Sequence, residues 1–295
     1  MAAGHHVAAV PQGRPARPPG PDIGGPVSKV IAITGAARGI GLATARALKA
    51  RGAAVVIGDI DEAAVNEAGE SLGVAAFPLD VTARESFEAF LANAEDAAGP
   101  LDVLVNNAGI MPIGPVTGES DADARRCLDV NVHGVMLGTK LALGRMLPRG
   151  RGHVINVASV AGVLPTPGLA LYNASKSAVV AFTEAARLEV QGTGVHVSAV
   201  LPTFTNTELI AGTRSPKGMR NCEPEEIAAA VAGLIARPRP QVVVPKALGR
   251  RIRLGALLPD RLRQAVSRRY GLDTLFLDYD PEARKPYNAR IRSTP

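Results

Sequence analysis

A β-branched run that ends in a glycine-rich turn constrains the fold of this chain more than any other feature. The run KVIAIT covers residues 29–34, the turn TGAARGIG follows it, and GIGLATARALKARG has helical spacing up to Gly52. Glycines in such a turn let the backbone approach a pyrophosphate, whose charge lies at the N-terminus of the next helix. The candidate cofactor-binding residues here are Gly35, Arg38, Gly39, Ile40 and Gly41. A purely structural turn remains the alternative, because the spacing is GxxxGxG rather than GxGxxG.

Strand-like and helix-like segments alternate along the rest of the chain. Further strands are predicted at residues 53–58, 74–78, 101–106, 152–158, 194–202 and 241–245, with helices at 61–72, 83–98, before 148, at 172–190 and at 224–236. Strands separated by helices of this length imply right-handed crossovers and a parallel sheet. Aromatic residues make up only 3% of the chain, so the core must consist of aliphatic side chains, which suits parallel strands under Ala-rich helices. The prediction is an α/β fold, a doubly wound parallel sheet of seven strands in a single domain.

Composition sets the expected boundaries. Residues 1–26 are rich in Pro, Gly and Arg, which predicts a disordered leader without the apolar core of a signal peptide. We expect residues 27–245 to form the domain and residues 246–295 to form a basic extension. No run of about 18 apolar residues occurs, so we expect a cytoplasmic protein. Cys127 and Cys222 fit neither a disulfide framework nor a metal-ligand spacing, so no metal site is expected.

Asp59 ends the second predicted strand, eighteen residues beyond Gly41. A carboxylate at this position can accept hydrogen bonds from the adenosine ribose hydroxyls and would repel a 2′-phosphate, which predicts NAD over NADP. Asp59 and Asp61 both precede a helix, so either could be its cap, and Asp61 suits that role better. Arg38 could attract a 2′-phosphate, which keeps NADP as the less favoured cofactor.

Tyr172 and Lys176 in the segment YNASK are four residues apart and therefore lie on one face of the predicted helix. An ammonium held near a phenol favours the phenolate and lowers the pKa of the tyrosine from its usual value of about 10. Such a tyrosine can exchange a proton with a substrate hydroxyl near neutral pH.

Several motifs occur together and in a fixed order. They are TGAARGIG, Asp59, Asp80 in LDVT, NNAG at 106–109, Asn131 in NVHG, Ser159 in INVAS, and YNASK. On these motifs, residues 27–245 resemble the short-chain dehydrogenase/reductases of the "classical" subtype. The resemblance implies a Rossmann-type sheet, a nicotinamide cofactor and reversible oxidoreduction of an alcohol and a ketone.

The resemblance also implies roles for individual residues. Tyr172 would be the general acid/base, and Lys176 would lower its pKa and bond the nicotinamide ribose. Ser159 would orient the substrate oxygen, and Asn131 would hold a water that links Lys176 to solvent. For the cofactor, Asp80 and Val81 would bind the adenine, Asn106 would be the contact from NNAG, and Thr205 and Thr207 would reach the carboxamide. The sequence departs from the family's Pro-Gly at Pro202-Thr203.

The segment VAGVLPTPGLAL after Ser159 is apolar, with Val163, Leu164, Leu169 and Leu171, which favours an apolar secondary alcohol or ketone as substrate. The irregular stretch 203–222 is consistent with a mobile lid. A catalytically silent NAD-binding sensor or scaffold on the same fold is the alternative function, because fold alone does not determine function. The resemblance implies a homotetramer or homodimer.

Residues 237–269 carry a net charge of +9, whereas the remaining chain sums to −3. An amphipathic helix is predicted after Pro259, with Leu262 and Val266 among arginines. It could cover the substrate pocket or a subunit boundary, or make a peripheral contact with an anionic membrane. Nucleic acid is not expected as a partner, because no aromatic residues are interleaved with the arginines.

Overall fold

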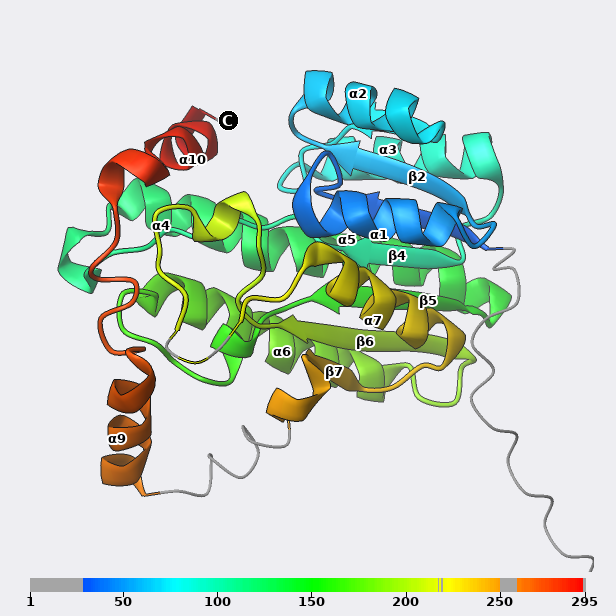
Figure 1. Ribbon diagram of the computed structural model, residues 1–295. Helices are drawn as coiled ribbons and strands as arrows, with labels where there is room; N and C mark the ends of the chain where they lie inside the picture. Colours follow the sequence, from blue (N-terminus) through cyan, green and yellow to red (C-terminus); the bar gives the residue numbers. More distant parts are fainter. Residues whose placement is uncertain (1–28, 217, 219, 250–258, 294–295) are drawn as a thin grey trace, which may run out of the picture.

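The described chain forms a seven-stranded sheet whose strands are all parallel (Figure 1). The computed structural model describes residues 29–216, 218, 220–249 and 259–293, so the predicted leader lies outside the described residues. The strands are β1 (Val30–Thr34), β2 (Ala54–Asp59), β3 (Ala75–Pro78), β4 (Val103–Asn106), β5 (Gly152–Val157), β6 (Val195–Pro202) and β7 (Gln241–Val244). Their spatial order is β3-β2-β1-β4-β5-β6-β7, which confirms the predicted Rossmann-type doubly wound sheet.

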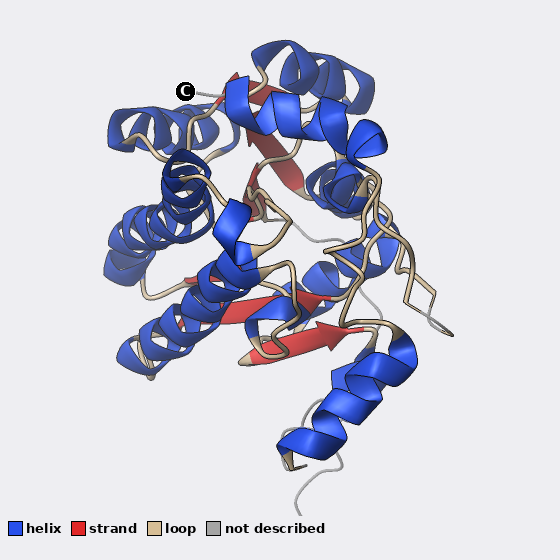
Figure 2. Cartoon of the chain, turned by 90° about the vertical axis from the view of Figure 1, so that its left-hand side faces the viewer, coloured by secondary structure: helices blue, strands red, loops and turns tan. Residues whose placement is uncertain are grey.

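Helices cover both faces of this sheet, as Figure 2 shows. The helices α1 (Gly39–Lys49), α2 (Glu62–Leu72) and α7 (Pro224–Ala236) pack on one face, and α3 (Arg84–Ala98), α5 (Gly134–Met146) and α6 (Ala170–Glu189) pack on the other. Successive side chains of a strand point to opposite faces of the sheet. Ile33 therefore packs in the apolar cluster under α1, α2 and α7, and Ala32 packs in the cluster under α3, α5 and α6. Ala-rich helices over aliphatic strands thus form two cores, as the composition predicted.

The strand order reverses at β1, which pairs with β2 on one side and with β4 on the other. In open parallel sheets, ligands bind beyond the carboxyl ends of the strands at such a switch point. Thr34 and Asn106 end these two neighbouring strands. The fold therefore places the glycine turn after β1 and the segment after β4 at the same edge.

The region before Pro148, expected as one long helix, consists of three pieces. Helix α4 (Asp121–Leu128) is capped by Ser120 and leads into a π-helical turn, η2 (Asp129–His133), before α5 begins. Single π-turns inside helices often occur at functional sites. The short 3₁₀ turns are η1 (Val116–Gly118), η3 (Leu147–Arg149), η4 (Val160–Gly162) and η5 (Glu208–Ile210).

The C-terminal extension returns to the carboxyl edge of the sheet (Figure 1). Helix α9 (Asp260–Tyr270) lies where an amphipathic helix was predicted, and a second helix, α10 (Pro281–Ser293), was not predicted. Phe276 and Tyr287 are buried, so residues 272–291 pack against the domain rather than extending from it. None of the helices in the described part of the chain has the length and apolar character that spanning a membrane requires.

Candidate active site

A cavity of about 1530 Å³ lies beyond the carboxyl ends of the strands. Sites for a single small molecule measure roughly 300–1,000 Å³, so this cavity has room for a dinucleotide and a substrate together. Twelve of the predicted site residues line it: Gly35, Arg38, Gly39, Ile40, Asp59, Asp80, Val81, Ser159, Tyr172, Lys176, Thr205 and Thr207. Gly41, Asn106 and Asn131 lie behind its surface.

The glycine turn requires residues without a side chain. Gly35 and Gly39 have φ values of +63° and +55°, which glycine adopts without strain. A Cβ on Gly35 would lie 2.6 Å from the Cα of Ala108, and one on Gly41 would lie 2.4 Å from the carbonyl oxygen of Gly35. The turn can therefore pack directly against the segment after β4.

The N-terminus of α1 faces this cavity without a side-chain cap. Arg38 occupies the N-cap position with no capping hydrogen bond, and the first turn contains no acidic residue. The first N–H groups of a helix need acceptors, and the helix dipole favours an anion there. The start of α1 is thus available to a phosphate group.

Asp59 and Asp61 make different contacts, and Asp61 is the helix cap, as predicted. Asp61 caps α2 by accepting a hydrogen bond from the N–H of Ala64 at 3.1 Å, and it pairs with Arg38 at 2.7 Å. The hydrogen bond from Arg38 holds the pKa of Asp61 below its ordinary value. Asp59 lines the cavity and accepts hydrogen bonds from the N–H groups of Ala37 at 3.0 Å and Asp61 at 3.2 Å.

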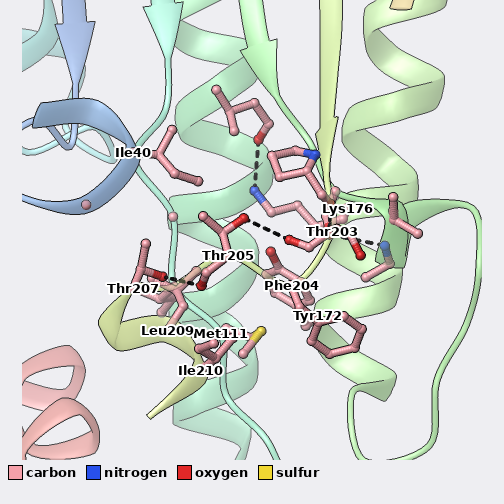
Figure 3. Close-up of a pocket in the computed structure, with 18 of the residues that line it drawn as sticks. Ile40, Met111, Tyr172, Lys176, Thr203, Phe204, Thr205, Thr207, Leu209 and Ile210 are labelled. Atoms are coloured by element: carbon pink, nitrogen blue, oxygen red, sulfur yellow. Dashed lines mark hydrogen bonds between the residues drawn. The ribbon is translucent and has the colours of Figure 1, made fainter. Parts of the chain in front are cut away.

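Tyr172 and Lys176 lie in the first turns of α6 (Figure 3). Ser159 caps the turn η4 after β5. The Nζ atom of Lys176 lies 5.7 Å from the centre of the Tyr172 ring and donates a hydrogen bond to the carbonyl oxygen of Val157 at 3.0 Å. The hydroxyl of Ser159 accepts a hydrogen bond from the N–H of Ala161 at 3.1 Å. The structure brings these three predicted side chains into one cavity.

Burial dominates the protonation of this pair. It raises the pKa of Tyr172 above its ordinary value, and a hydrogen bond with Ser159 opposes that rise. Burial lowers the pKa of Lys176 to about 8. We expected the ammonium of Lys176 to lower the pKa of Tyr172, but here desolvation of the phenolate outweighs any such effect, and Lys176 is itself shifted toward the neutral amine.

Asn131 is fully buried in the π-helical turn. Its Oδ1 accepts a hydrogen bond from the N–H of Ile110, and its Nδ2 donates to the carbonyl oxygen of Ile110, both at 2.8 Å. A Cβ on Gly109 would lie 3.2 Å from Asn131 Oδ1 and 3.4 Å from Lys176 Nζ. Asn131 therefore fixes the segment after β4, and Gly109 of that segment lies close to both Asn131 and Lys176.

The expected contact of Asn106 with the cofactor is not supported by its position. Its Nδ2 donates to Asn156 Oδ1 at 2.9 Å and to Thr139 Oγ1 at 3.3 Å, inside the core. The neighbouring Asn107 lines the cavity instead and donates to the carbonyl oxygen of Gly35 at 2.8 Å. Adjacent residues at a strand end point to opposite sides, so only one asparagine can face the cavity.

Asp80 and Val81, the residues predicted to bind the adenine, both line the cavity. Asp80 Oδ1 accepts hydrogen bonds from the N–H of Thr82 at 2.8 Å and from its hydroxyl at 2.7 Å. These bonds hold the Asp80 carboxylate at the loop after β3.

The segment after β6 is held by its own threonines. Thr205 Oγ1 donates to the carbonyl oxygen of Thr203 at 2.9 Å, and Thr207 Oγ1 donates to that of Thr205 at 3.4 Å (Figure 3). No described residue other than glycine has a positive φ, so Thr203 fits its backbone without strain in place of the family's glycine.

Beyond the residues predicted for the site, other apolar side chains line the cavity, including some from the stretch 203–222 that was expected to be a lid. Val163, Leu164 and Leu169 line it as expected, whereas Leu171 does not. The additional lining residues are apolar or aromatic and come from three segments: Met111, Phe204, Leu209, Ile210, Leu272, Phe276 and Tyr287. Phe204 and Phe276 stack with their ring centres 5.7 Å apart. No sequence signal pointed to Phe276 or Tyr287, because their contacts span more than 70 residues of chain.

In the part of the chain that the structure describes, no group of His, Cys, Asp and Glu side chains could hold a metal ion. The doubly wound sheet, its glycine turn at the switch point and the serine, tyrosine and lysine in the same cavity define a dinucleotide-binding oxidoreductase.

A family model described as short chain dehydrogenase matches residues 29–218. The chain belongs to this family, which confirms the resemblance. It is 40% identical over 221 residues to cis-4-hydroxycyclohexanecarboxylate dehydrogenase of Sinomonas cyclohexanicum, a match that covers 70% of this chain and 88% of the relative. It is 38% identical over 232 residues to 2-(S)-hydroxypropyl-CoM dehydrogenase 3 of Xanthobacter autotrophicus, covering 71% and 90% of the two chains.

Among solved structures, 3-ketoacyl-(acyl-carrier-protein) reductase of Brucella melitensis in complex with NADH is similar to this chain. The TM-score is 0.68 at 30% sequence identity, and the match covers 74% of this chain and 97% of the other.

Proposed function

We propose that the protein interconverts an apolar secondary alcohol and its ketone by NAD-dependent hydride transfer, with Tyr172 as general acid/base. One observation carries the proposal: Ser159, Tyr172 and Lys176 line the same cavity as Gly35 and Asp59. A dinucleotide held by the second pair would lie beside an alcohol held by the first group. The bound nicotinamide accepts or supplies the hydride, and the protein orients the substrate and moves the proton.

The residues present fit such a cofactor. The uncapped start of α1 and the turn Gly35–Gly41 suit a pyrophosphate, and Asp80 and Val81 suit the adenine. Thr205 and Thr207 are assigned to the carboxamide, and Lys176 to the nicotinamide ribose. Asn107 replaces Asn106 as the asparagine proposed to line the cofactor site.

NAD is the proposed cofactor, with NADP disfavoured. The Asp59 carboxylate is oriented by two backbone N–H groups at the end of β2, where it suits ribose hydroxyls and would repel a 2′-phosphate. Arg38, the cation that could offset this repulsion, is paired with Asp61. The Brucella melitensis reductase in complex with NADH supports a nicotinamide cofactor in this fold.

Proton transfer is assigned to Tyr172. Because burial raises its pKa, the phenol keeps its proton at neutral pH and can donate it to a ketone oxygen. In the direction of oxidation, the phenol must first release its own proton toward solvent, and the phenolate then accepts the alcohol proton. Ser159 holds the same substrate oxygen, and Asn131 is assigned to a water relay that serves Lys176.

The substrate is proposed to have an apolar body, since Met111, Leu169 and Phe276 form its end of the cavity. The relatives named above act on different alcohols, so they support the reaction class rather than one substrate. A panel of secondary alcohols, assayed with NAD and with NADP at matched concentrations, tests the proposal. Cofactor binding without turnover on the whole panel would instead favour an NAD-binding sensor or scaffold.

A homodimer or homotetramer is proposed through α5 and α6, where Met136 and Leu188 are exposed apolar side chains. Light scattering of the purified chain tests it, and a monomer at micromolar concentration would contradict it.

The C-terminal extension is proposed to cover the pocket, since α9 and α10 both contribute to the lining. Its alternative use, contact with an anionic membrane, predicts that Leu262→Asp reduces pelleting with anionic liposomes. We keep the proposal of a cytoplasmic location.

A further inference from the structure

Tyr287 of α10 brings a polar group to the apolar end of the cavity. Its side chain is only 3% exposed, and it lines the same cavity as Met111, Tyr172 and Phe276. Its hydroxyl oxygen accepts a hydrogen bond from the N–H of Met111 at 2.8 Å. A phenol can also donate one hydrogen bond, and among the described residues no acceptor takes this proton.

The surroundings of Tyr287 are positively charged. The guanidinium groups of Arg284 and Arg290 lie 4.7 Å and 5.3 Å from the centre of its ring. Arg290 pairs with Glu208. Arg284 is fully buried, and its hydrogen-bond partners are the carbonyl oxygens of Leu209, Ala211 and Met111, with no carboxylate partner in the described structure.

We propose that Tyr287 determines substrate specificity by donating a hydrogen bond to a second oxygen of the substrate, remote from the reacting alcohol or ketone. This inference rests on the proposed function and narrows its substrate class to an apolar alcohol or ketone with a second oxygen acceptor. A carboxylate is the favoured acceptor, because the buried charge of Arg284 lacks an anionic partner. Burial raises the pKa of Tyr287 to about 12, so the phenol retains its proton at neutral pH.

Arg284 is the positioning residue for this contact. Its three hydrogen bonds join α10 to the turn η5 and to the segment after β4. Met111 is bonded to Arg284 through its carbonyl and to Tyr287 through its N–H. The Tyr287 hydroxyl is thereby fixed relative to the loop that ends next to the catalytic cavity.

The test compares three probes that differ only at one position: cyclohexanol, 4-hydroxycyclohexanecarboxylate and the corresponding carboxamide. We measure kcat/KM for the wild type, Tyr287→Phe and the control Tyr279→Phe. Tyr279 lies in the same segment but does not line the cavity. Because a hydrogen bond to a charged group is involved, Tyr287→Phe should lower the carboxylate-to-cyclohexanol ratio of kcat/KM about tenfold or more, mainly through KM. The control should keep the wild-type ratio.

An unchanged ratio in Tyr287→Phe would overturn the inference, and a ratio lowered only for the carboxamide would overturn the preference for an anion. Calorimetric binding of cyclohexanecarboxylate in the presence of NAD provides a readout without turnover. If no probe is oxidised but this acid still binds the wild type more tightly than Tyr287→Phe, the proposed function fails and the inference stands.

For Arg284, we expect Arg284→Met to raise KM for the carboxylate more than Arg284→Lys does, with NAD affinity retained in both. Equal KM values would remove its positioning role.

Discussion

The carboxylate of Asp59 accepts a hydrogen bond from the backbone N–H of Ala37 at 3.0 Å, which ties the end of β2 to the glycine turn after β1. β1 and β2 are neighbouring strands of the sheet, and the bond orients the carboxylate at the edge of the cavity before any ligand arrives. A negative charge held in this way should decide which dinucleotide can bind.

Asp59→Asn should therefore shift the cofactor preference toward NADP. The amide can still accept the hydrogen bond from Ala37, but it no longer repels a 2′-phosphate. Two like charges a few ångströms apart near a surface repel by roughly 1–4 kcal/mol, so the NADP-to-NAD ratio of kcat/KM should rise about tenfold or more. Steady-state kinetics with both cofactors measures the ratio, and an unchanged ratio would contradict the role of Asp59.

Tyr172→Phe should retain NAD affinity but lose turnover, since only the hydroxyl that transfers the proton is removed. General acid–base catalysis contributes roughly 10²–10⁴-fold, so kcat should fall by at least about a hundredfold. Calorimetric titration with NAD checks the affinity, and Tyr279→Phe is the matched control. A wild-type rate in Tyr172→Phe would refute its catalytic role.

Asn106→Ala and Asn107→Ala should have different effects. Asn106→Ala removes a donor from the buried group formed with Asn156 and Thr139, so we expect the free energy of unfolding to fall by about 1–3 kcal/mol. Asn107→Ala changes a residue of the cavity lining and should raise KM for NAD. Urea denaturation and cofactor kinetics of both variants separate the effects, and a larger rise in KM from Asn106→Ala would restore the original assignment.

His153 should make the fold less stable in acid. Burial lowers the pKa of this imidazole from 6.5 to about 3, and it is hydrogen-bonded to Ser198 at 2.8 Å. Between these pH values the unfolded chain binds the proton and the folded chain does not, so the free energy of unfolding falls as the pH is lowered. The largest slope from this group is about 1.4 kcal/mol per pH unit.

His153→Gln should lack this component while keeping a polar partner for Ser198. Urea denaturation between pH 7 and pH 4 compares the two proteins, and acidic groups common to both cancel in the difference. Parallel curves for the wild type and the variant would show that His153 does not contribute.

Much of this protein could be predicted from local patterns. The order of strands and helices follows from apolar periodicity, and the turn with Gly35 follows from the need for a backbone that a side chain would block. The pairing of Tyr172 with Lys176 follows from helical geometry. The assignment of Asp61 as the cap of α2 also held, because capping depends on the few residues around a helix start.

Other features depend on contacts that no local pattern encodes. Which of Asn106 and Asn107 faces the cavity depends on how β4 is seated between β1 and β5. The pKa of Tyr172 is set by burial under residues of the C-terminal segment as well as by its own helix. Helical spacing places Lys176 near the phenol, but only packing determines how much water is excluded from both.

The sequence by itself determined the family, the doubly wound sheet and which residues are the candidates for proton transfer, because each of these is encoded within a few neighbouring residues or in the order of motifs. Only the tertiary structure decided that the C-terminal segment forms a wall of the cavity, with Arg284 bonded to Leu209, Ala211 and Met111. The reason is physical: a guanidinium buried without a carboxylate needs three carbonyl oxygens at once, and only the folded chain brings them together.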